Sequence, residues 1–285
     1  MIQEEIKQAS ISVVMSIYKS ENAHYFEECL ESIWTAQTLK PKQIIIIQDG
    51  ELPDSLLEVL KRWKNTLGDN MILHVNKDNI GLTKSLNIGI GYVTEKYIAR
   101  MDSDDISTPD RFEKQYKYLE AHPDICALGS SAMEIDKDGK ELFLRHYPKG
   151  EKAVKECICK ATPLQHSAVM MRSDVFKSGL VAYDERYRLT QDLALWFDML
   201  CAGLKIENLD DTLLKFRITE SSFSRRNKVK SKNEFQIYVK GIFRLYGFTW
   251  RYVYPVARYI YRRMPKKVVS MLFQSRFRRR LLKQK

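Results

Sequence analysis

The feature that most constrains this chain is the alternation of short apolar runs with segments that carry apolar residues at helical spacing. Residues 11–17 form a β-branched, apolar run typical of a buried strand, and residues 26–34 then place apolar side chains on one side of a helix. Further strands are predicted at 43–48, 71–75 and 97–101, and further helices at 56–63 and 83–90. This alternation predicts an α/β fold with an open, mostly parallel central sheet and helices on both faces.

Charge is distributed unevenly along the chain. Of the 47 Lys and Arg residues, 14 follow Glu234, the last acidic residue, so residues 1–234 carry 33 basic against 36 acidic side chains, a net charge of −3. No repeat or low-complexity segment interrupts residues 1–225. We therefore predict one folded domain over residues 1–225 and a basic C-terminal region over residues 226–285.

The composition is that of a globular protein, with 44% hydrophobic and 29% charged residues. The chain opens with a polar, acidic segment where an export signal would need a basic and then apolar start, and no apolar run approaches the roughly 18 residues that span a bilayer. Its five cysteines have no spacing typical of a disulfide framework; Cys157 and Cys159 leave a metal site open only as a minor alternative. We expect a protein of the reducing cytoplasm.

Ligands of open parallel sheets bind beyond the carboxyl ends of the strands. Three carboxylates, Asp102, Asp104 and Asp105, follow the predicted strand at 97–101. Carboxylates this close repel one another unless a cation lies among them, and oxygen ligands favour Mg²⁺ or Mn²⁺. The alternative is a solvated acidic turn that caps the helix starting near residues 108–110. The segment alone does not decide between these interpretations.

Two further strand ends supply weaker candidates. Asp49 ends the run IIIIQDG, where a carboxylate can accept hydrogen bonds from a nucleobase or a ribose, or can simply precede the turn at Gly50. In the segment NIGLTKSLNIGI, residues 79–90, backbone N–H groups and Lys84 could face a phosphate. The glycines of that segment could equally serve turns and close helix packing.

Asp192 precedes the apolar run LALWFDML and is predicted near the N-terminus of a buried helix. The helix dipole there favours an ionised carboxylate, which is what a general base needs. A helix cap is the competing interpretation.

These motifs together carry a family resemblance. ISVVMSIYK, IIIIQDG, NIGLTKSLNIGI, ARMDSDD, QHSAVMMR and QDLALW occur in the order and approximate spacing of family 2 glycosyltransferases. The resemblance covers residues 10–225 and implies the GT-A fold, a single nucleotide-binding α/β domain. Within the family, the chain resembles bacterial enzymes that add a hexose during O-antigen or exopolysaccharide assembly.

The resemblance implies roles for the residues at the strand ends. Asp49 matches the aspartate that contacts the uracil of a UDP-sugar, and Ser16 and Tyr18 match one side of the base pocket. Asp102 and Asp104 match the Asp-Xaa-Asp motif, in which the second carboxylate binds Mn²⁺ or Mg²⁺ on the diphosphate and the first faces the ribose or the metal's waters.

Roles are also implied farther along the chain. Asp192 matches the catalytic base, and His166 and Trp196 match residues that line the acceptor and donor-sugar pocket. Arg217, with Ser222, matches a loop that can close over the diphosphate.

The sequence departs from the family pattern at three positions. Gln48 and Gln191 stand where the family usually has acidic residues, although the aspartate that follows each is kept. A neutral Gln191 removes a like charge from beside the base and marks altered acceptor handling or a slow enzyme. Leu86 stands at a position usually held by arginine, which leaves Lys84 as the cation for the phosphates.

The resemblance implies inverting transfer from a UDP-sugar, with UDP-glucose or UDP-galactose favoured, to an undecaprenyl-diphosphate-linked sugar. One rival is a sugar-phosphate nucleotidyltransferase, but the first strand is not followed by a glycine-rich phosphate loop. The other rival is a nucleic-acid-binding protein, which the basic tail favours but the near-neutral remainder of the chain does not. We expect an enzyme with no nucleic-acid partner.

The basic tail has the pattern of an interfacial membrane segment. Arg251, Arg258 and Arg262 fall at helical spacing among Tyr, Val and Ile, and residues 268–283 form a second basic segment. Pro255 interrupts the first helix, so two short amphipathic pieces are predicted. We expect these to bind anionic lipid on the inner face of the cytoplasmic membrane; a solvated tail or a nucleic-acid contact is the alternative.

Overall fold

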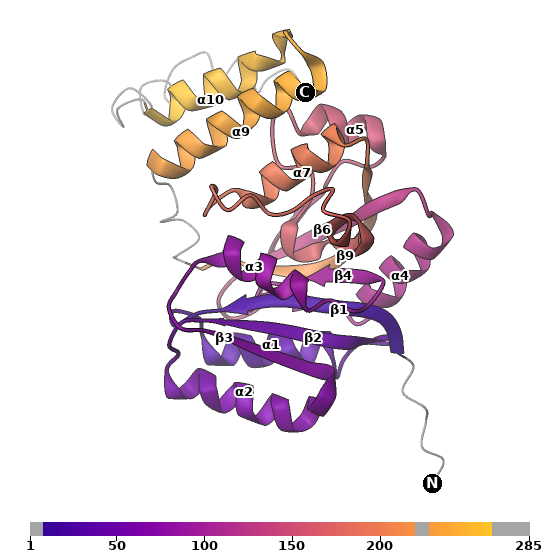
Figure 1. Cartoon of the computed structure of the whole chain (residues 1–285), viewed down its shortest axis with the longest axis vertical. Helices are drawn as coiled ribbons and strands as arrows, with labels where there is room; N and C mark the ends of the chain where they lie inside the picture. Colours follow the sequence, from indigo (N-terminus) through magenta and orange to yellow (C-terminus); the bar gives the residue numbers. More distant parts are fainter. Residues whose placement is uncertain (1–7, 220–227, 264–285) are drawn as a thin grey trace.

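One sheet runs through the computed structural model, which describes residues 8–219 and 228–263 (Figure 1). Its strands are β1 (Gln8–Ile17), β2 (Lys40–Asp49), β3 (Met71–Asn76), β4 (Tyr97–Arg100), β5 (Ile106–Ser107), β6 (Ile125–Ile135), β7 (Glu141–Arg145), β8 (Met170–Arg172) and β9 (Lys205–Arg217). Their order is β3-β2-β1-β4-β8-β6-β9-β5, with β7 paired to β6. Strands β3, β2, β1 and β4 are parallel, whereas β8 pairs antiparallel with both β4 and β6. The predicted α/β fold with a largely parallel central sheet is confirmed.

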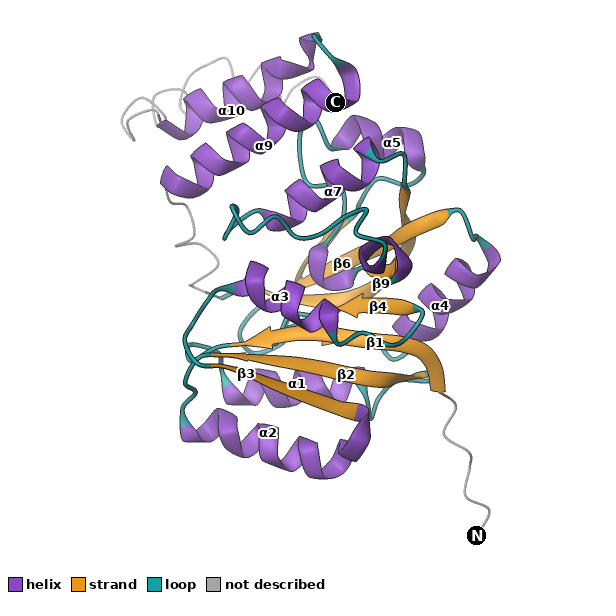
Figure 2. Ribbon diagram, in the orientation of Figure 1, coloured by secondary structure: helices purple, strands orange, loops and turns teal. Residues whose placement is uncertain are grey.

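Helices cover both faces of the sheet (Figure 2). They are α1 (Ala23–Ile33), α2 (Asp54–Leu67), α3 (Leu82–Gly91), α4 (Arg111–Ala121), α5 (Glu151–Cys157), α6 (Asp174–Lys177), α7 (Gln191–Cys201), α9 (Lys228–Tyr246) and α10 (Val253–Arg263), with short 3-10 turns η1 (Gly68–Asn70), η2 (His166–Ala168) and η3 (Trp250–Tyr252). Helices α1, α2 and α4 pack on one face, and α3, α6 and α7 on the other.

Two hydrophobic cores follow from the period-two geometry of the strands. In β2, Ile44 and Ile46 belong to the core under α1 and α2, whereas Ile45 and Ile47 belong to the core under α3. Successive side chains of a strand point to opposite faces, so a run of four isoleucines fits only a strand covered on both sides. This burial fixes β1, β2 and β4 side by side, with their carboxyl ends at one edge of the sheet.

Helix α9 packs against α7, and α10 packs against α9, farther from the sheet (Figure 1). The rings of Phe197 on α7 and Tyr238 on α9 meet edge to face with centroids 6.0 Å apart. A Cβ at Gly241 would lie 2.2 Å from the Phe197 ring, so glycine permits this close approach. The predicted boundary between residues 225 and 226 lies outside the described residues, but α9 beyond it contributes to the second core. In the described ranges, no helix is long and apolar enough to cross a membrane.

Candidate active site

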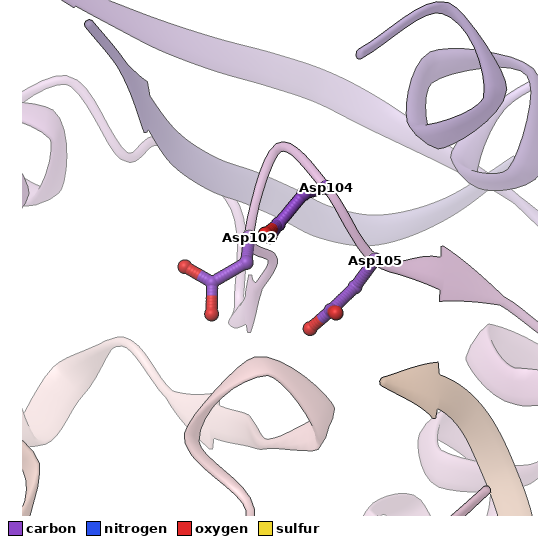
Figure 3. A group of neighbouring side chains, drawn as sticks. All are labelled: Asp102, Asp104 and Asp105. Carbon is purple, nitrogen blue, oxygen red and sulfur yellow. The ribbon is translucent and has the colours of Figure 1, made fainter. Parts of the chain in front are cut away.

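Three carboxylates gather on the loop that follows β4. Asp102, Asp104 and Asp105 project from one tight loop (Figure 3), and one oxygen of each lies within 4.8 Å of the others. Asp105 is buried, and Asp102 and Asp104 are partly exposed. Burial, with the neighbouring charges of Asp104 and Asp102, raises the pKa of Asp105 well above its usual value. The two exposed carboxylates are therefore the accessible ligands of this loop.

The acidic loop fits a divalent cation. Asp105 accepts a hydrogen bond from the backbone N–H of Arg217 through Oδ1 at 2.9 Å. Its Oδ2 is buried and has no hydrogen-bond partner among the described residues. The partly exposed carboxylates of Asp102 and Asp104 lie close together and offer the hard-oxygen donors that Mg²⁺ or Mn²⁺ prefers.

Three buried arginines lie behind the acidic loop. Arg100 pairs with the carboxylate of Asp102, which raises the pKa of the guanidinium although burial alone would lower it. The Arg111 Nη2 donates to the backbone carbonyl of Arg100 at 2.9 Å, and burial lowers the pKa of Arg111. Arg217 Nε donates to the carbonyl of Asp104 at 3.0 Å. The protein itself thus balances part of the loop's negative charge and fixes its backbone.

Arg217 differs from its predicted placement. It is the last residue of β9 rather than part of a loop, and it is almost fully buried. Its Nη1 donates to the carbonyls of Asp136 and Lys137, and its Nη2 lies 2.8 Å from Glu28 on α1. The prediction that it lies in a closing loop is wrong, because antiparallel pairing of β5 with β9 and parallel pairing of β6 with β9 carry the strand to this point. Ser222 lies outside the described residues.

The side chain of Asp49, the last residue of β2, binds the turn that follows β3. Its Oδ1 accepts from the N–H of Ile80 at 2.8 Å, and its Oδ2 accepts from the N–H of Gly81 at 2.8 Å. The Asn76 side chain donates to the same Oδ1 at 3.1 Å. Asp49 therefore organises residues 79–81 at the sheet edge, a role that the predicted uracil contact did not include.

Ser16 and Tyr18 lie beside Asp49 because β1 and β2 pair in parallel, with Ser16 opposite Ile47. Ser16 is partly buried and Tyr18 is exposed.

On α3, Lys84 is exposed, whereas Leu86 is buried in the second core. The exposed position of Lys84 agrees with a ligand-binding role, which stays a prediction.

Asp192 lies in the first turn of α7, after Thr190, a non-glycine residue with a left-handed φ of 67°. The charges of both Asp192 and Asp102 act on the buried Tyr183 hydroxyl. Burial raises the pKa of Tyr183, and these two carboxylates add to the increase against the opposing Arg100. The role of Asp192 as the base stays a prediction, and its place in the first turn of α7 agrees with the sequence analysis.

His166 and Trp196 are buried behind this site. His166 Nε2 lies 2.6 Å from the Tyr183 hydroxyl, and its ring centroid is 6.1 Å from that of Trp196. Burial, with the positive charge of Arg100, lowers the pKa of His166 well below its usual value. The Trp196 side chain is fully buried, and its Nε1 has no hydrogen-bond partner within the described ranges. Both residues were predicted to line the pocket, which stays a prediction; Trp196 belongs to the second hydrophobic core.

Comparison with known proteins places this architecture. The model of the family described as "Glycosyl transferase family 2" matches residues 12–180, which is more than half of the chain. The chain belongs to glycosyl transferase family 2.

Relatives within family 2 include enzymes of polysaccharide synthesis. The amylovoran biosynthesis glycosyltransferase AmsE of Erwinia amylovora is 34% identical over 268 residues, which cover 92% of this chain and 97% of that protein. A UDP-Gal:alpha-D-GlcNAc-diphosphoundecaprenol beta-1,3-galactosyltransferase of Escherichia coli is 28% identical over 77% of this chain and 78% of that one. The predicted resemblance to bacterial exopolysaccharide and O-antigen glycosyltransferases is confirmed.

The fold is also that of solved GT-A glycosyltransferases. S. aureus TarS 1-349, in a crystal structure with UDP-GlcNAc, superposes with a TM-score of 0.61 at 15% identity, covering 92% of this chain and 83% of that one. At this identity the likeness shows the fold.

Several residues of this family 2 site were not predicted from the sequence. The Arg188 guanidinium would lie 3.0 Å from a Cβ at Gly81, so it covers the turn that Asp49 organises. No hydrogen bond or ion pair joins Arg188 to another described residue, so its guanidinium is a cation that the sequence analysis did not consider. Tyr183 also escaped notice. The sequence around Arg188 and Tyr183 contains no motif that predicts their positions. Those positions depend on residues 183–190 lying along α3, where the Thr83 hydroxyl donates to the carbonyl of Tyr187.

Proposed function

We propose that this glycosyltransferase moves a hexose from a UDP-sugar to a hydroxyl of a lipid-diphosphate-linked sugar, with inversion at the anomeric carbon. One observation carries the proposal: Asp102, Asp104 and Asp105 converge on the loop after β4 in a chain that matches glycosyl transferase family 2. We add Asp192, in the first turn of α7, as the second group. An inverting transfer needs these two groups together, one to face the leaving diphosphate and one to accept the proton of the attacking hydroxyl.

Asp192 acts as the general base. It takes the proton of the acceptor hydroxyl as that oxygen attacks the anomeric carbon from the side opposite UDP. The bond between the anomeric carbon and the diphosphate oxygen breaks, and the UDP leaves with the electron pair. In-line attack converts an α-linked UDP-sugar into a β-glycoside.

Cations would stabilise the leaving UDP. A divalent ion, Mn²⁺ or Mg²⁺, bound by Asp104 and Asp102 would supply positive charge at the diphosphate. From the protein side, Lys84 and Arg188 lie on the two segments that flank the turn of Asp49. We assign Asp49, Ser16 and Tyr18 to the nucleoside end of the donor.

The donor and acceptor classes follow the names of related proteins. The Escherichia coli relative is named for UDP-Gal and for an acceptor on diphosphoundecaprenol, and the TarS structure contains UDP-GlcNAc. We propose UDP-glucose or UDP-galactose as donor and an undecaprenyl-diphosphate-linked sugar as acceptor, in O-antigen or exopolysaccharide synthesis. Catalysis then belongs to residues 1–225, and residues 226–285 hold the enzyme at the cytoplasmic face of the membrane.

A donor screen tests this proposal. The purified chain is incubated with a panel of UDP-sugars, Mn²⁺ and a synthetic lipid-diphosphate-linked sugar, and both UDP release and the linkage of the product are measured. We expect release of UDP and a β-linked product with one or two of the donors. Release of pyrophosphate from UTP and a sugar phosphate, without glycosyl transfer, would instead identify a nucleotidyltransferase.

Asp192→Asn supplies the decisive variant. Asp198→Asn is its matched control, because Asp198 lies on the same helix α7 but pairs with Arg244 at the surface. We expect the first variant to lose transfer and keep UDP binding, and the second to keep both. Equal loss of transfer and of UDP binding in Asp192→Asn would point to a structural role for this carboxylate.

A further inference from the structure

Two arginines of the basic stripe of α10 pair with helix α9. Arg258 Nη2 lies 2.8 Å from Glu234 on α9, and Arg262 pairs with the other oxygen of the same carboxylate. Glu234 is buried between the two helices, and Tyr259 stacks on Phe235 with ring centroids 4.5 Å apart. Arg258 and Arg262 remain partly exposed, as expected, but their guanidinium groups are paired with an acidic residue on α9.

The opposite face of α10 and the turn before it are apolar and exposed. Phe248 is 93% exposed, Trp250 63%, Val253 62% and Ile260 50%. Val253, Val256 and Ile260 follow helical spacing, so they share one face. Of the fifteen large hydrophobic residues exposed in the described part of the chain, eight lie between residues 243 and 261. Such clustering marks an interaction surface, since scattered exposed residues would need no explanation.

Local helix capping does not account for this exposure. Gly247, with a φ of 63°, ends α9, and its N–H donates to the carbonyl of Phe243 at 2.9 Å. A hydrophobic contact between Phe243 and the residue after the glycine is the usual companion of such a cap, and here Phe248 meets Phe243 with ring centroids 5.4 Å apart. Both rings nevertheless remain more than half exposed, so the contact leaves most of their apolar area in water.

Basic side chains border this apolar surface. The Arg251 guanidinium lies over the Tyr246 ring at 4.4 Å, and the Lys160 ammonium lies over the Tyr254 ring at 5.0 Å. Outside the described residues, the sequence of 264–285 contains eight Lys or Arg and no acidic residue, which is a statement of composition alone. Aromatic and aliphatic side chains with a basic border have the chemistry of a lipid interface, where rings lie at the level of the headgroups and cations meet anionic lipid.

We propose that the surface formed by Phe248, Trp250, Val253, Val256 and Ile260, the apolar wedge, inserts into the lipid interface of a membrane. This deepens the membrane association put forward under the proposed function, and it replaces electrostatic attachment of α10 by hydrophobic insertion. Helix α9 separates α10 from α7, whose first turn carries Asp192 (Figure 1). Insertion therefore holds the active site at a set distance from the membrane that bears a lipid-linked acceptor.

Vesicle binding by the full chain tests the wedge. The double variant Phe248→Ser with Ile260→Ser removes two exposed apolar side chains, and Leu142→Ser with Phe143→Ser does the same on β7 as a matched control. Sedimentation with phosphatidylcholine vesicles, with and without phosphatidylglycerol, is measured at about 0.1 M and about 1 M salt, between which the screening length falls from about 10 Å to about 3 Å.

We expect wild type and the β7 control to keep binding at high salt, and the wedge variant to bind at least about tenfold more weakly at both salt concentrations. Wild-type binding that disappears at high salt would overturn the proposal and leave only electrostatic attachment through the basic residues. Unchanged binding by the wedge variant would also overturn it, and would assign the surface to another occupant, such as residues 264–285 or a second copy of the chain.

Sugar transfer to a soluble acceptor is measured in parallel for all three proteins. The wedge variant is expected to retain wild-type transfer in solution, because its substitutions lie outside the active site. Salt-resistant vesicle binding by a chain that transfers no sugar would support the wedge and refute the proposed function. Active enzyme without vesicle binding would do the reverse.

Discussion

Replacing Arg217 by alanine tests whether this residue supports the acidic loop or contacts the donor. Its guanidinium is buried and donates to the carbonyls of Asp104, Asp136 and Lys137 as well as to Glu28. A buried acceptor left without a partner costs about 1–3 kcal/mol, and removing one partner of a buried ion pair costs about 3–5 kcal/mol. Glu28 is partly exposed and can be hydrated when Arg217 is removed. We therefore expect a loss in the lower part of the ion-pair range, a decrease of about 3–4 kcal/mol in the free energy of unfolding.

That loss is large against the roughly 5–15 kcal/mol that stabilise a folded domain. For a chain of this size it corresponds to a fall in Tm of about 10 °C. Thermal unfolding of Arg217→Ala is compared with Arg186→Ala, which breaks an exposed ion pair with Asp184 and is expected to cost less than about 1 kcal/mol. A Tm within about 2 °C of wild type, together with a raised KM for the UDP-sugar, would refute the supporting role and favour direct contact with the diphosphate.

The remaining predictions concern the base, the metal and a buried histidine. Asp192→Asn should lower kcat by at least about a hundredfold with little change in UDP binding measured by calorimetry. Asp104→Ala should abolish transfer, whereas Asp138→Ala, at an exposed turn, should leave transfer unchanged. Loss of wild-type activity in a chelator should be reversed by Mn²⁺ or Mg²⁺. Full activity in excess chelator would exclude a required ion. Burial lowers the pKa of His166 in the folded chain, so below about pH 6.5 the unfolded chain binds a proton at this residue and the folded chain does not. The free energy of unfolding therefore decreases as the pH falls, by up to about 1.4 kcal/mol per pH unit. His166→Gln should flatten the pH dependence of Tm between pH 6.5 and 5.

Much of the N-terminal half could be predicted because its signals are local. The isoleucine run of β2 and the helical stripe of α2 each bury apolar area that a short window of sequence displays. Parallel pairing then brings the strand ends together, so the sequence predicts Asp49 and the acidic loop at one edge of the sheet. These elements depend on periodicity alone.

The supports of the active site were not predictable in the same way. Arg217 reaches Glu28 across 189 residues, and nothing near either residue indicates the other. Arg100 and Arg111 read as ordinary basic residues beside aspartates, and only the sheet edge shows that both are buried. A sequence window reports which side chains carry charge, whereas burial and long-range partners decide whether that charge binds a ligand or holds the backbone.

The basic tail shows the same ambiguity in a sharper form. Helical spacing correctly indicated that Arg258 and Arg262 share a face of α10. It could not indicate what that face meets, because Glu234 lies on a different helix and the hairpin turn at Gly247 brings it there. Both guanidinium groups pair with one buried carboxylate while their side chains stay partly exposed, and Val253, Val256 and Ile260 on another side of the helix are exposed. An amphipathic pattern therefore fixes the two faces of a helix, and the charge of the neighbouring helix selects which of them is left for a partner.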